Sequence, residues 1–589
     1  MTQPTSSQRF WTKAGDRLAS LTISAGGLLM VGSLVLIFLL IVSEAIPLFV
    51  APRITAAGAP AASLDDPTSP ALASNVPRVT LGARSLLCVG DEAGDIRVFD
   101  VADNAQPKLL ETVRLHPDAP AAVTVLGTLV GGETLIAGDA RGRVSGLLLL
   151  RKAPESEERH LKVVREYERN AAAVTAFAAS PRGKTFLTGD AEGGVRARFG
   201  TNGRSLASTH AGAPVTALEF GPKGKAFIAA TPGGPRYFTL DAPHPEISFA
   251  ALFGKQLYEG YDSPEYVWQS SGGTDDFESK LSLVPLIFGT LKGTFYAMLF
   301  AVPIGLAAAL YTSVFATPKV KRIVKPVVEI MAALPSVVLG FLAGLWLAPL
   351  IQKATVSTLL LVPSVPLFVL AGVFLFQLLP FETRQHVRPG HELFLVLPLA
   401  CLGALFAWYA GPLFERLFFS GDFKAWLLTS AGLKYDARNS LVIAFAMGFA
   451  VIPIIFTISE DALSSVPEHL KAASLALGAS PWQTAIRVIL PTASAGIFSA
   501  LMVGFGRAVG ETMIVLMATG NTPILDWNIF NGMRTLAANI AVEIPEAPQG
   551  GTLYRVLFLA ALLLFAVTFV VNTLAEALRQ RLRRKYTVI

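Results

Sequence analysis

Eight long apolar runs restrict what this chain can fold into. Each is close to the length a helix needs to cross the roughly 30 Å hydrocarbon layer of a bilayer. The runs occupy residues 18–42, 283–315, 327–351, 356–379, 393–413, 441–458, 492–518 and 554–572. The chain has 52% hydrophobic and only 16% charged residues, which is too apolar for an ordinary soluble protein. The sequence therefore predicts a multi-pass helical membrane protein.

The basic residues predict the orientation of these runs. The first run, residues 18–43, follows a basic segment, residues 1–17, and is longer than the apolar core of a signal peptide, which is usually about 7 to 15 residues. We therefore expect a retained anchor. Bases in the loop after the second run and in the tail, residues 579–589, fall on the same side as the N-terminus, and the positive-inside rule makes that side cytoplasmic. These bases are Lys319, Lys321, Arg322, Lys325, Arg579, Arg581, Arg583, Arg584 and Lys585. The tail is also compatible with a patch that binds membrane lipid.

Residues 78–245 have the composition of a soluble β domain and repeat at a period of roughly forty-odd residues. One half of the repeat is an apolar strand followed by Asp-x-x-Gly, ending at Gly94, Gly142 and Gly193. Asp first and Gly fourth are typical of a type I turn in a hairpin. We expect about four blades of a β-propeller outside the cytoplasm, resembling WD40-type repeats. A ring completed by a partner and a β-sandwich are the alternatives.

The remaining soluble segments contain no pattern typical of an enzyme. Residues 51–77 form a linker rich in Ala, Pro and Ser, and residues 246–283 form an aromatic and acidic segment of the kind found at membrane interfaces. The GPKGK sequence around Gly224 lacks phosphate-loop spacing and is interpreted as a hairpin turn. Cys88 and Cys401 suggest no disulfide, and the nearest histidine pair, His386 and His391, suggests no metal site. We expect no metal, cofactor or nucleic acid.

The polar loop at residues 460–491 predicts two short helices joined by a tight bend. The first helix ends at Gly478, the residue type best able to adopt a left-handed C-terminal turn. Ser480 and Gln483 have the spacing of a capping box at the start of the second helix, with Pro481 at its first position. This bend is either a contact surface or a plain corner of a helical protein.

The apolar run at residues 492–518 contains two charged residues, Arg507 and Glu511, four apart on one face of a predicted helix. The two can therefore pair, and Glu511 is expected to hold the guanidinium fork of Arg507 when no anion is present. Charges at this depth usually face a bundle interior or a transport pathway, and the Arg fork can donate two hydrogen bonds to one tetrahedral oxyanion. The alternative is an ion pair that only fixes packing, because Gly506 and Gly510 form a GxxxG face where another helix can approach closely.

These motifs carry a family resemblance. The 460–491 loop resembles the EAA loop of type I ABC importer permeases, with the triplet at Ala472-Ala473-Ser474, the glycine at Gly478 and an Ile-Leu-Pro ending at Pro491. The leading glutamate of the triplet is absent. Three further stretches, residues 285–311, 333–341 and 506–523, resemble the phosphate permeases of this family. The repeat domain and the extra pair of runs between residues 356 and 413 resemble a long form of these permeases, and the motifs imply no role for them.

The resemblance implies a type I ABC importer permease fold over residues 284–578, with an inserted all-β propeller-like domain, in a bacterial inner membrane. It implies the permease subunit of an ATP-driven importer of inorganic phosphate, and Arg507 and Glu511 as residues of the pathway. The implied partners are a second permease subunit, a pair of ATPase subunits and an external phosphate-binding protein. The ATPases are expected to dock at Ala472, Ala473, Ser474, Gly478, Ser480, Trp482 and Pro491.

The chain has no ATP-binding motif, so the energy is expected to come from a partner and the chain itself is not expected to be an enzyme. Two alternatives belong to other functional classes. One is a permease for another oxyanion, such as sulfate or molybdate. The other is a membrane-anchored propeller that acts as a scaffold or a sensor.

Overall fold

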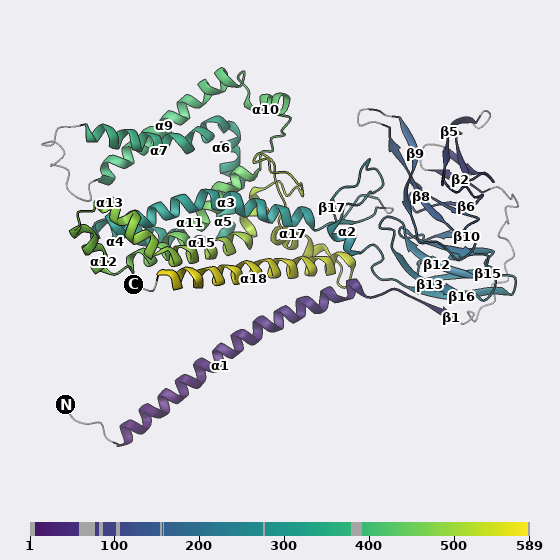
Figure 1. The fold of residues 1–589 in the computed structure, drawn as a ribbon, viewed down its shortest axis with the longest axis horizontal. Coiled ribbons are helices and arrows are strands. Elements are labelled where there is room, and N and C mark those ends of the chain that lie inside the picture. The colour runs from purple at the N-terminus through teal and green to yellow at the C-terminus, as the bar shows by residue number, and fades with distance from the viewer. Residues whose placement is uncertain are drawn as a thin grey trace. The chain divides into compact units, whose positions relative to one another are not determined.

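The computed structural model describes residues 6–57, 77–81, 86–101, 107–152, 156, 158–274, 277–378 and 392–586 (Figure 1). The chain divides into two compact units. The first comprises Met1–Val284 with Pro548–Phe558, and the second comprises Pro285–Ala547 with Leu559–Ile589. His386, His391, most of the predicted linker (residues 58–76) and the last three residues of the basic tail lie outside the described residues.

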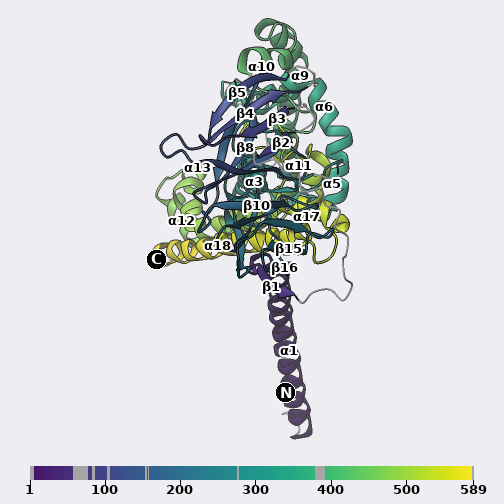
Figure 2. The ribbon, with the colours of Figure 1, turned by 90° about the vertical axis from the view of Figure 1, so that its right-hand side faces the viewer.

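Four antiparallel sheets of four strands each make up most of the first unit (Figure 2). Three of them contain consecutive strands in chain order, and the fourth combines β14–β16 with β1. The strands are β1 (Arg53–Ala57), β2 (Arg78–Leu81), β3 (Leu86–Gly90), β4 (Asp95–Asp100), β5 (Lys108–Arg114), β6 (Val123–Thr128), β7 (Thr134–Asp139), β8 (Val144–Arg151), β9 (Arg159–Glu166), β10 (Val174–Ala179), β11 (Thr185–Asp190), β12 (Gly194–Phe199), β13 (Ser205–His210), β14 (Ala217–Phe220), β15 (Ala226–Thr231) and β16 (Gly234–Asp241). Four-stranded sheets repeated along the chain are the blades of a propeller-like domain, as predicted.

The Asp-x-x-Gly turns have the predicted geometry. The Oδ1 atom of Asp190 accepts a hydrogen bond from the backbone N–H of Gly194 at 2.7 Å, and Gly193 has φ of +94°. A side chain at Gly193 would lie 2.6 Å from the carbonyl oxygen of Ala213, so only glycine lets the turn pack against the start of the next repeat. The same arrangement recurs at Asp91 and Asp139.

The first strand of the domain corrects the predicted linker. β1 lies within residues 51–77 and pairs antiparallel with β16, with Arg53 opposite Asp241 and Ala57 opposite Tyr237. The strand is only five residues long and largely exposed, so its sequence carries almost no alternating pattern. The fourth sheet is thus completed by a strand that precedes the first sheet in the chain.

Buried apolar side chains form clusters that join each sheet to the next one along the chain. Leu81 and Leu135 belong to a cluster that draws on the first and second sheets. Phe186 belongs to a cluster shared by the second and third, and Phe227 to one shared by the third and fourth. Burying such side chains is the main favourable term in folding the domain.

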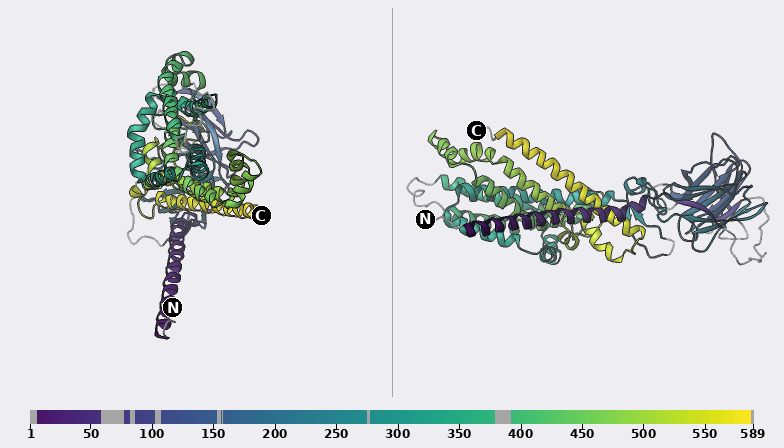
Figure 3. Two further views of the ribbon diagram at one scale, coloured as in Figure 1. Left: turned by 90° about the vertical axis from the view of Figure 1, so that its left-hand side faces the viewer. Right: turned by 90° about the horizontal axis from the view of Figure 1, so that it is seen from below.

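The first unit also contains the N-terminal helix and the segment that follows the sheets. Helix α1 (Ser6–Ala45) is a single long helix, drawn in dark purple (Figure 3), and the short helix η1 (Ile46–Phe49) follows it. The predicted interfacial segment contains α2 (Phe249–Phe253) and a small hairpin of β17 (Trp268–Gln269) and β18 (Lys280–Leu281).

The second unit is helical, although the first residue of its first helix and the first residues of its last helix are assigned to the first unit. Its elements are α3 (Val284–Leu310), η3 (Tyr311–Phe315), α4 (Pro318–Ala332), α5 (Ser336–Leu342), η4 (Ala343–Leu347), α6 (Ala348–Lys353), α7 (Thr355–Gln377), α9 (Glu392–Phe418), α10 (Phe423–Ala431), α11 (Ser440–Ser464), α12 (Glu468–Ala476), α13 (Pro481–Thr484), η5 (Ala485–Ile489), α14 (Leu490–Thr492), α15 (Ser494–Val509), α16 (Met513–Ala518), α17 (Leu536–Glu543), η6 (Ile544–Glu546) and α18 (Thr552–Tyr586). Helix α11 is the most buried of its long apolar helices, with 72% of its most apolar window inside the structure.

Within the described residues, seven helices are long and apolar enough to cross a membrane, and a bent pair of helices gives an eighth crossing if it is counted as one span. Two predicted runs are broken. Residues 327–351 are interrupted at Pro335, between α4 and α5, and residues 492–518 are interrupted at Gly510, between α15 and α16. A proline and a glycine are the residues that most readily end a helix, which accounts for both breaks.

The extra pair of runs forms a close helical hairpin. At Gly411 of α9, a side chain would lie 2.0 Å from the hydroxyl oxygen of Ser357 on α7. At Gly403 it would lie 2.9 Å from the backbone of Val365. Small residues at these positions let α7 and α9 pack backbone to backbone.

Candidate functional site

Helices α12 and α13 form the bend predicted from the sequence, here called the elbow (residues 468–484), and they lie next to each other (Figure 1, Figure 2). Gly478 has φ of +85°, so it makes the left-handed turn at which α12 stops. The predicted capping box is present. The backbone N–H of Gln483 donates to Ser480 Oγ at 3.2 Å, and the backbone N–H of Ser480 donates to Gln483 Oε1 at 2.9 Å.

A hydrogen bond between side chains ties the two arms of the elbow together. The hydroxyl groups of Ser474 and Thr484 lie 2.9 Å apart, and Thr484 is buried. The arms are therefore fixed relative to each other by this bond as well as by the Gly478 turn, which makes the elbow a stiff unit.

The outer surface of the elbow is apolar although the surrounding loop is polar. Leu477 is 89% exposed and Trp482 is 60% exposed, and Ala472 and Ala473 are exposed beside them. The indole ring of Trp482 stacks on the ring of Phe315, with 6.3 Å between the ring centroids. Phe315 is the last residue of η3, which continues α3. Clustered exposed apolar side chains on a polar segment are typical of surfaces that contact another protein or a membrane.

An ion pair anchors the base of the elbow. Helix α11 continues to Ser464, so the first residues of the predicted loop are helical. Glu460, with a side chain only 3% exposed, accepts from Lys325 of α4 at 2.6 Å and from Ser464 Oγ at 2.9 Å. The basic loop after α3 is thereby joined to the helix that leads into the elbow.

The helix that leads away from the elbow is bent. Residues Pro481–Thr492 and Ser494–Val509 meet at an angle of 69°. The apolar run at residues 492–518 predicts one continuous helix from Pro491 to Arg507, and this bend contradicts that prediction. Pro491 lacks a backbone N–H for the helical ladder, and η5, immediately before it, has the wider turn of a π-helix, which is a common cause of sharp kinks.

Arg507 and Glu511 do not pair as predicted. Helix α15 ends at Val509 with Gly510 as its C-cap, so Glu511 lies beyond the helix. Glu511 Oε1 instead accepts from the backbone N–H of Ile514 at 3.3 Å, at the start of α16. In the part of the chain that the structure describes, no ion pair joins the two, and the buried Nε atom of Arg507 has no hydrogen-bond partner. The guanidinium is therefore free of the carboxylate that was expected to hold it.

The glycines that bring helices close together are not the predicted pair. A side chain at Gly506 would meet its nearest atom, in Asn572 of α18, at an ordinary 3.8 Å, and one at Gly510 would meet only backbone of its own segment. The tight approaches are to α11. A side chain at Gly496 would lie 2.4 Å from Ala462, and one at Gly504 would lie 2.9 Å from Ile455. The signal for them is a stripe of small residues at every fourth position, Gly496, Ala500, Gly504 and Ala508.

Sequence reasoning also missed a buried lysine in α3. Lys292 is 0% exposed, and its Nζ atom has no hydrogen-bond partner among the described residues. The carboxylates of Asp526 and Asp436 attract it from beyond salt-bridge distance. The sequence does contain a signal for this residue, because Lys292 is the only basic residue in the apolar run 283–315.

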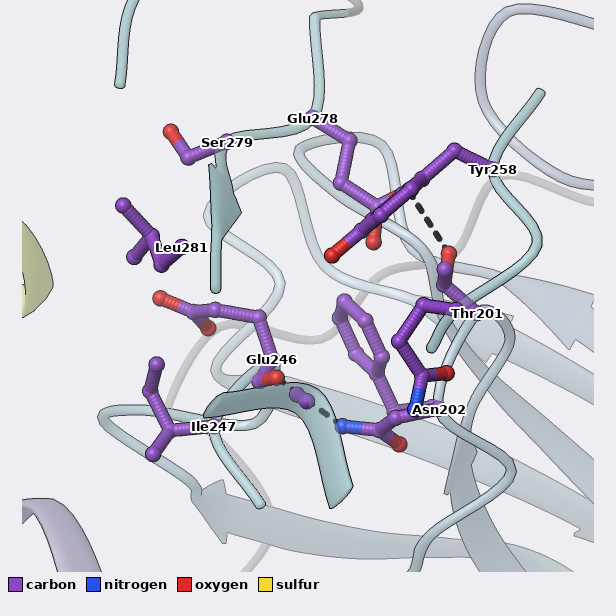
Figure 4. A pocket seen from close by; sticks show the side chains of 11 residues that line it. Thr201, Asn202, Glu246, Ile247, Tyr258, Glu278, Ser279 and Leu281 are labelled. Carbon is purple, nitrogen blue, oxygen red and sulfur yellow. Dashed lines mark hydrogen bonds between the residues drawn. The ribbon is translucent and has the colours of Figure 1, made fainter. Parts of the chain in front are cut away.

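The first unit has a second polar site, a small cavity beside the β17–β18 hairpin (Figure 4). Glu278 accepts from Thr201 Oγ1 at 2.6 Å, and its side chain lies against the ring of Tyr258 (Figure 4). Asn202 donates to the carbonyl oxygen of Glu246 at 3.0 Å. Burial raises the pKa of Glu278 to about 7, and burial also raises the pKa of Glu246.

The raised pKa makes the first unit sensitive to pH. Between the ordinary value of 4.5 and about 7, the unfolded chain ionises Glu278 while the folded chain keeps it protonated, so stability falls as pH rises. Below pH 4.5 Glu278 is protonated in both the folded and the unfolded chain, so it does not affect stability. Above about pH 7 it is ionised in both, and the whole loss of stability caused by ionising a buried carboxyl remains. The loss amounts to about 3 kcal/mol. Denaturant unfolding of the full chain from pH 4.5 to 8, followed by the β-sheet signal, measures it.

The control for this prediction is a pair of variants. Glu278→Gln is expected to remove the part of the pH dependence that Glu278 causes and to leave the part that Glu246 causes. Glu92→Gln is expected to leave the pH dependence of stability unchanged, because Glu92 is an exposed carboxyl on a turn. Identical pH profiles for Glu278→Gln and the unaltered chain would contradict the assignment.

The relatives of known family match about half of this chain, and the family model matches residues that lie mostly within the helical unit. The family of binding-protein-dependent transport system inner membrane components matches residues 301–584. The phosphate transport system permease protein PstC of Pasteurella multocida is 28% identical over 309 residues, 52% of this chain and 77% of that protein. PstC of Xylella fastidiosa is 29% identical over 309 residues, which are 52% of this chain and 76% of that protein. The probable ABC transporter permease protein YqgH of Bacillus subtilis is 25% identical over 325 residues, which are 55% of this chain and 80% of that protein.

Residues 301–584 match this family and are here called the permease domain. The matched residues of the permease domain contain the elbow, the Lys325–Glu460 pair and Arg507. The similarity to PstC proteins predicted from the three motifs is confirmed. Together with the seven apolar helices, it makes the chain a multi-pass inner-membrane protein.

The sheets of the first unit precede the part matched by the permease family. A solved structure, the β-propeller domain of Cps50 (Swd1) from Myceliophteria thermophila, resembles 28% of this chain with a TM-score of 0.24 and 11% identity, and the likeness covers 51% of that chain. The propeller-like assignment stands on the four sheets themselves.

Glu460→Gln in the permease domain is expected to lower the free energy of unfolding by about 1–3 kcal/mol, because a buried charge-assisted hydrogen bond is lost. Detergent-solubilised protein unfolded with denaturant measures the change. Glu468→Gln is the control, since Glu468 is 85% exposed in its pair with Lys471 at 3.2 Å, and exposed pairs contribute little. Equal effects of the two substitutions would show that Glu460 is no anchor.

Proposed function

We propose that this chain is the permease subunit of an ATP-driven phosphate importer, that it forms half of the translocation pathway, and that it couples to ATPase subunits through the elbow. The similarity to PstC proteins supports phosphate as the substrate. A second permease subunit would supply the other half of the pathway.

The observation that carries the proposal is the exposed apolar surface of the elbow. A stiff bend that presents Leu477 and Trp482 to the outside suits insertion into a groove of an ATPase subunit. The coupling residues proposed from the resemblance are Ala472, Ala473, Ser474, Gly478, Ser480, Trp482 and Pro491. ATP binding by the partner would move the elbow as one piece, because the Ser474–Thr484 bond and the capping box hold its arms together.

Arg507 is proposed as the anion contact of the pathway. Its Nε atom lacks a partner within the described residues, so the fork can donate to an oxyanion without first breaking an ion pair. Glu511 is proposed as a pathway residue that positions the break after α15, since its carboxylate caps the start of α16. At a break of this kind the backbone is freed from helical bonding and can line a pathway.

The proposed orientation places both termini in the cytoplasm and the propeller-like domain in the periplasm. Counting the bent pair of helices as one span gives an even number of crossings, which returns the C-terminus to the side of the N-terminus. The bases around Lys325 and in the tail then fall inside. An external phosphate-binding protein would deliver its ligand to the outer face.

The test is uptake of labelled phosphate by cells that express this chain with a second permease, an ATPase and a phosphate-binding protein, against cells that lack only this chain. Uptake that depends on the chain and resists a tenfold excess of sulfate or molybdate supports the proposal. Competition by sulfate or molybdate would assign the chain to another oxyanion. Absence of chain-dependent uptake of any of the three would favour a scaffold or sensor.

A further inference from the structure

Two turns of the propeller-like domain open onto one cavity. Residues 180–184, Ser-Pro-Arg-Gly-Lys, join β10 to β11, and residues 221–225, Gly-Pro-Lys-Gly-Lys, join β14 to β15. Residues 277–279, next to the β17–β18 hairpin, supply another wall. The cavity has a volume of about 340 Å³, which is within the range of small-ligand sites.

Three basic side chains line this cavity without a counter-charge. Arg182, Lys223 and Lys225 belong to exposed positions of the two turns, and within the described ranges none of them has a carboxylate within 4 Å. The fourth base, Lys184, is buried and used internally, because its Nζ atom donates to Glu259 at 2.5 Å and to the carbonyl oxygen of Val130. The cavity is therefore left with three positive charges.

The carboxyl groups of the cavity wall offset only part of this charge near neutral pH. The carboxylate of Glu278 accepts a hydrogen bond from Thr201 (Figure 4), and burial disfavours the ionised form of both Glu278 and Glu246. The hydroxyl group of Ser180 and that of Ser279 add polar groups to the lining.

The turns themselves do not require these bases. The equivalent turn between β6 and β7, residues 129–133, reads Leu-Val-Gly-Gly-Glu and contains no basic residue, yet it joins the same pair of strands in its sheet. A structural role in closing the hairpin therefore does not explain why bases of two successive repeats gather at one cavity.

We propose that this cavity binds a phosphate group, either as free inorganic phosphate or as the headgroup of an anionic lipid. A phosphate group offers several strong acceptor oxygens and one or two negative charges, which match an Arg fork flanked by two ammonium groups. The site is separate from Arg507, and it does not depend on the chain being a phosphate permease.

The test is residue-resolved chemical footprinting of the full chain. Acetylation of Lys223 and Lys225 is compared with that of Lys108 and Lys162, exposed lysines elsewhere in the domain, with and without inorganic phosphate in neutral detergent. The same comparison is made in phosphatidylcholine bilayers with and without phosphatidylglycerol. Bound phosphate is expected to slow the cavity lysines at least about threefold, because occupied charge-assisted hydrogen bonds must first break.

The detergent and bilayer experiments together identify the source of the phosphate group. Protection by inorganic phosphate in detergent assigns the free ion, and protection only in bilayers with phosphatidylglycerol assigns the headgroup. Absence of protection in both, or equal protection of Lys108 and Lys162, would overturn the proposal.

Variants give an independent measurement. Protection of Arg182 from phenylglyoxal is followed in K223Q/K225Q and in the matched control K108Q/K162Q, which has the same net charge. The concentration of phosphate, or the fraction of phosphatidylglycerol, that gives half protection is expected to rise at least about tenfold in the cavity variant, the effect of losing roughly one charge-assisted hydrogen bond. An unchanged half-protection point in K223Q/K225Q would refute the site.

Discussion

Arg507→Gln is expected to abolish phosphate uptake while the subunit still inserts and assembles with its partners. The substitution keeps much of the length of the side chain but removes its charge and the fork that can donate two hydrogen bonds to one oxyanion. Charge-assisted hydrogen bonds contribute about 1.5–3 kcal/mol each, so losing two of them lowers uptake by at least about 100-fold. Initial rates of labelled phosphate uptake measure this effect, and copurification of the partner subunits reports assembly.

The matched control is Arg416→Gln, an exposed arginine in the last turn of α9. It is expected to leave uptake unchanged, because among the described residues no hydrogen bond or ion pair joins it to the break after α15. Normal uptake by Arg507→Gln would remove Arg507 from the pathway. Loss of assembly in the same variant would instead assign the side chain a packing role.

Gly478→Val is expected to uncouple ATP hydrolysis from transport. Gly478 has φ of +85°, and a side chain there would meet nothing within 4 Å, so the substitution acts through backbone strain and through the surface offered to a partner. A non-glycine residue in this conformation costs about 1–2 kcal/mol, enough to open the turn that sets the angle between α12 and α13. The ratio of phosphate imported to ATP hydrolysed, measured in proteoliposomes, is expected to fall about tenfold.

Gly432→Val separates strain from coupling. Gly432 ends α10 with φ of +65°, and a side chain there would also meet nothing within 4 Å, so the two substitutions impose similar strain on a helix end. Coupling is expected to be unchanged in this variant. If both variants lower the ratio equally, general destabilisation explains the effect and the elbow loses its proposed role.

The features that sequence predicted correctly are local ones. The Asp-x-x-Gly turns and the capping box of Ser480 and Gln483 depend on residues at most four apart, so their chemistry is visible in a short window. The apolar runs are similarly local, and they predicted the membrane helices except where Pro335 and Gly510 end a helix inside a run.

The features that sequence reasoning missed depend on distant partners. Strand β1 pairs with a strand about 180 positions away, and Lys325 finds Glu460 on another helix, so no short window contains both members. The expected pairing of Arg507 with Glu511 failed for a different reason. Spacing of four residues brings side chains together only while the helix continues, and Gly510 stops it between them.

The pairing of β1 with β16 has a consequence for the origin of this architecture. Arg53 and Asp241 face each other in register, so the chain enters and leaves the four sheets at neighbouring positions, within the roughly 5 Å that separates paired strands. A domain whose ends meet in this way can be gained or lost in one step, because removing it leaves a gap that a short link closes. The four sheets thus form one insertion, between the first and second membrane helices, that begins and ends at the same place.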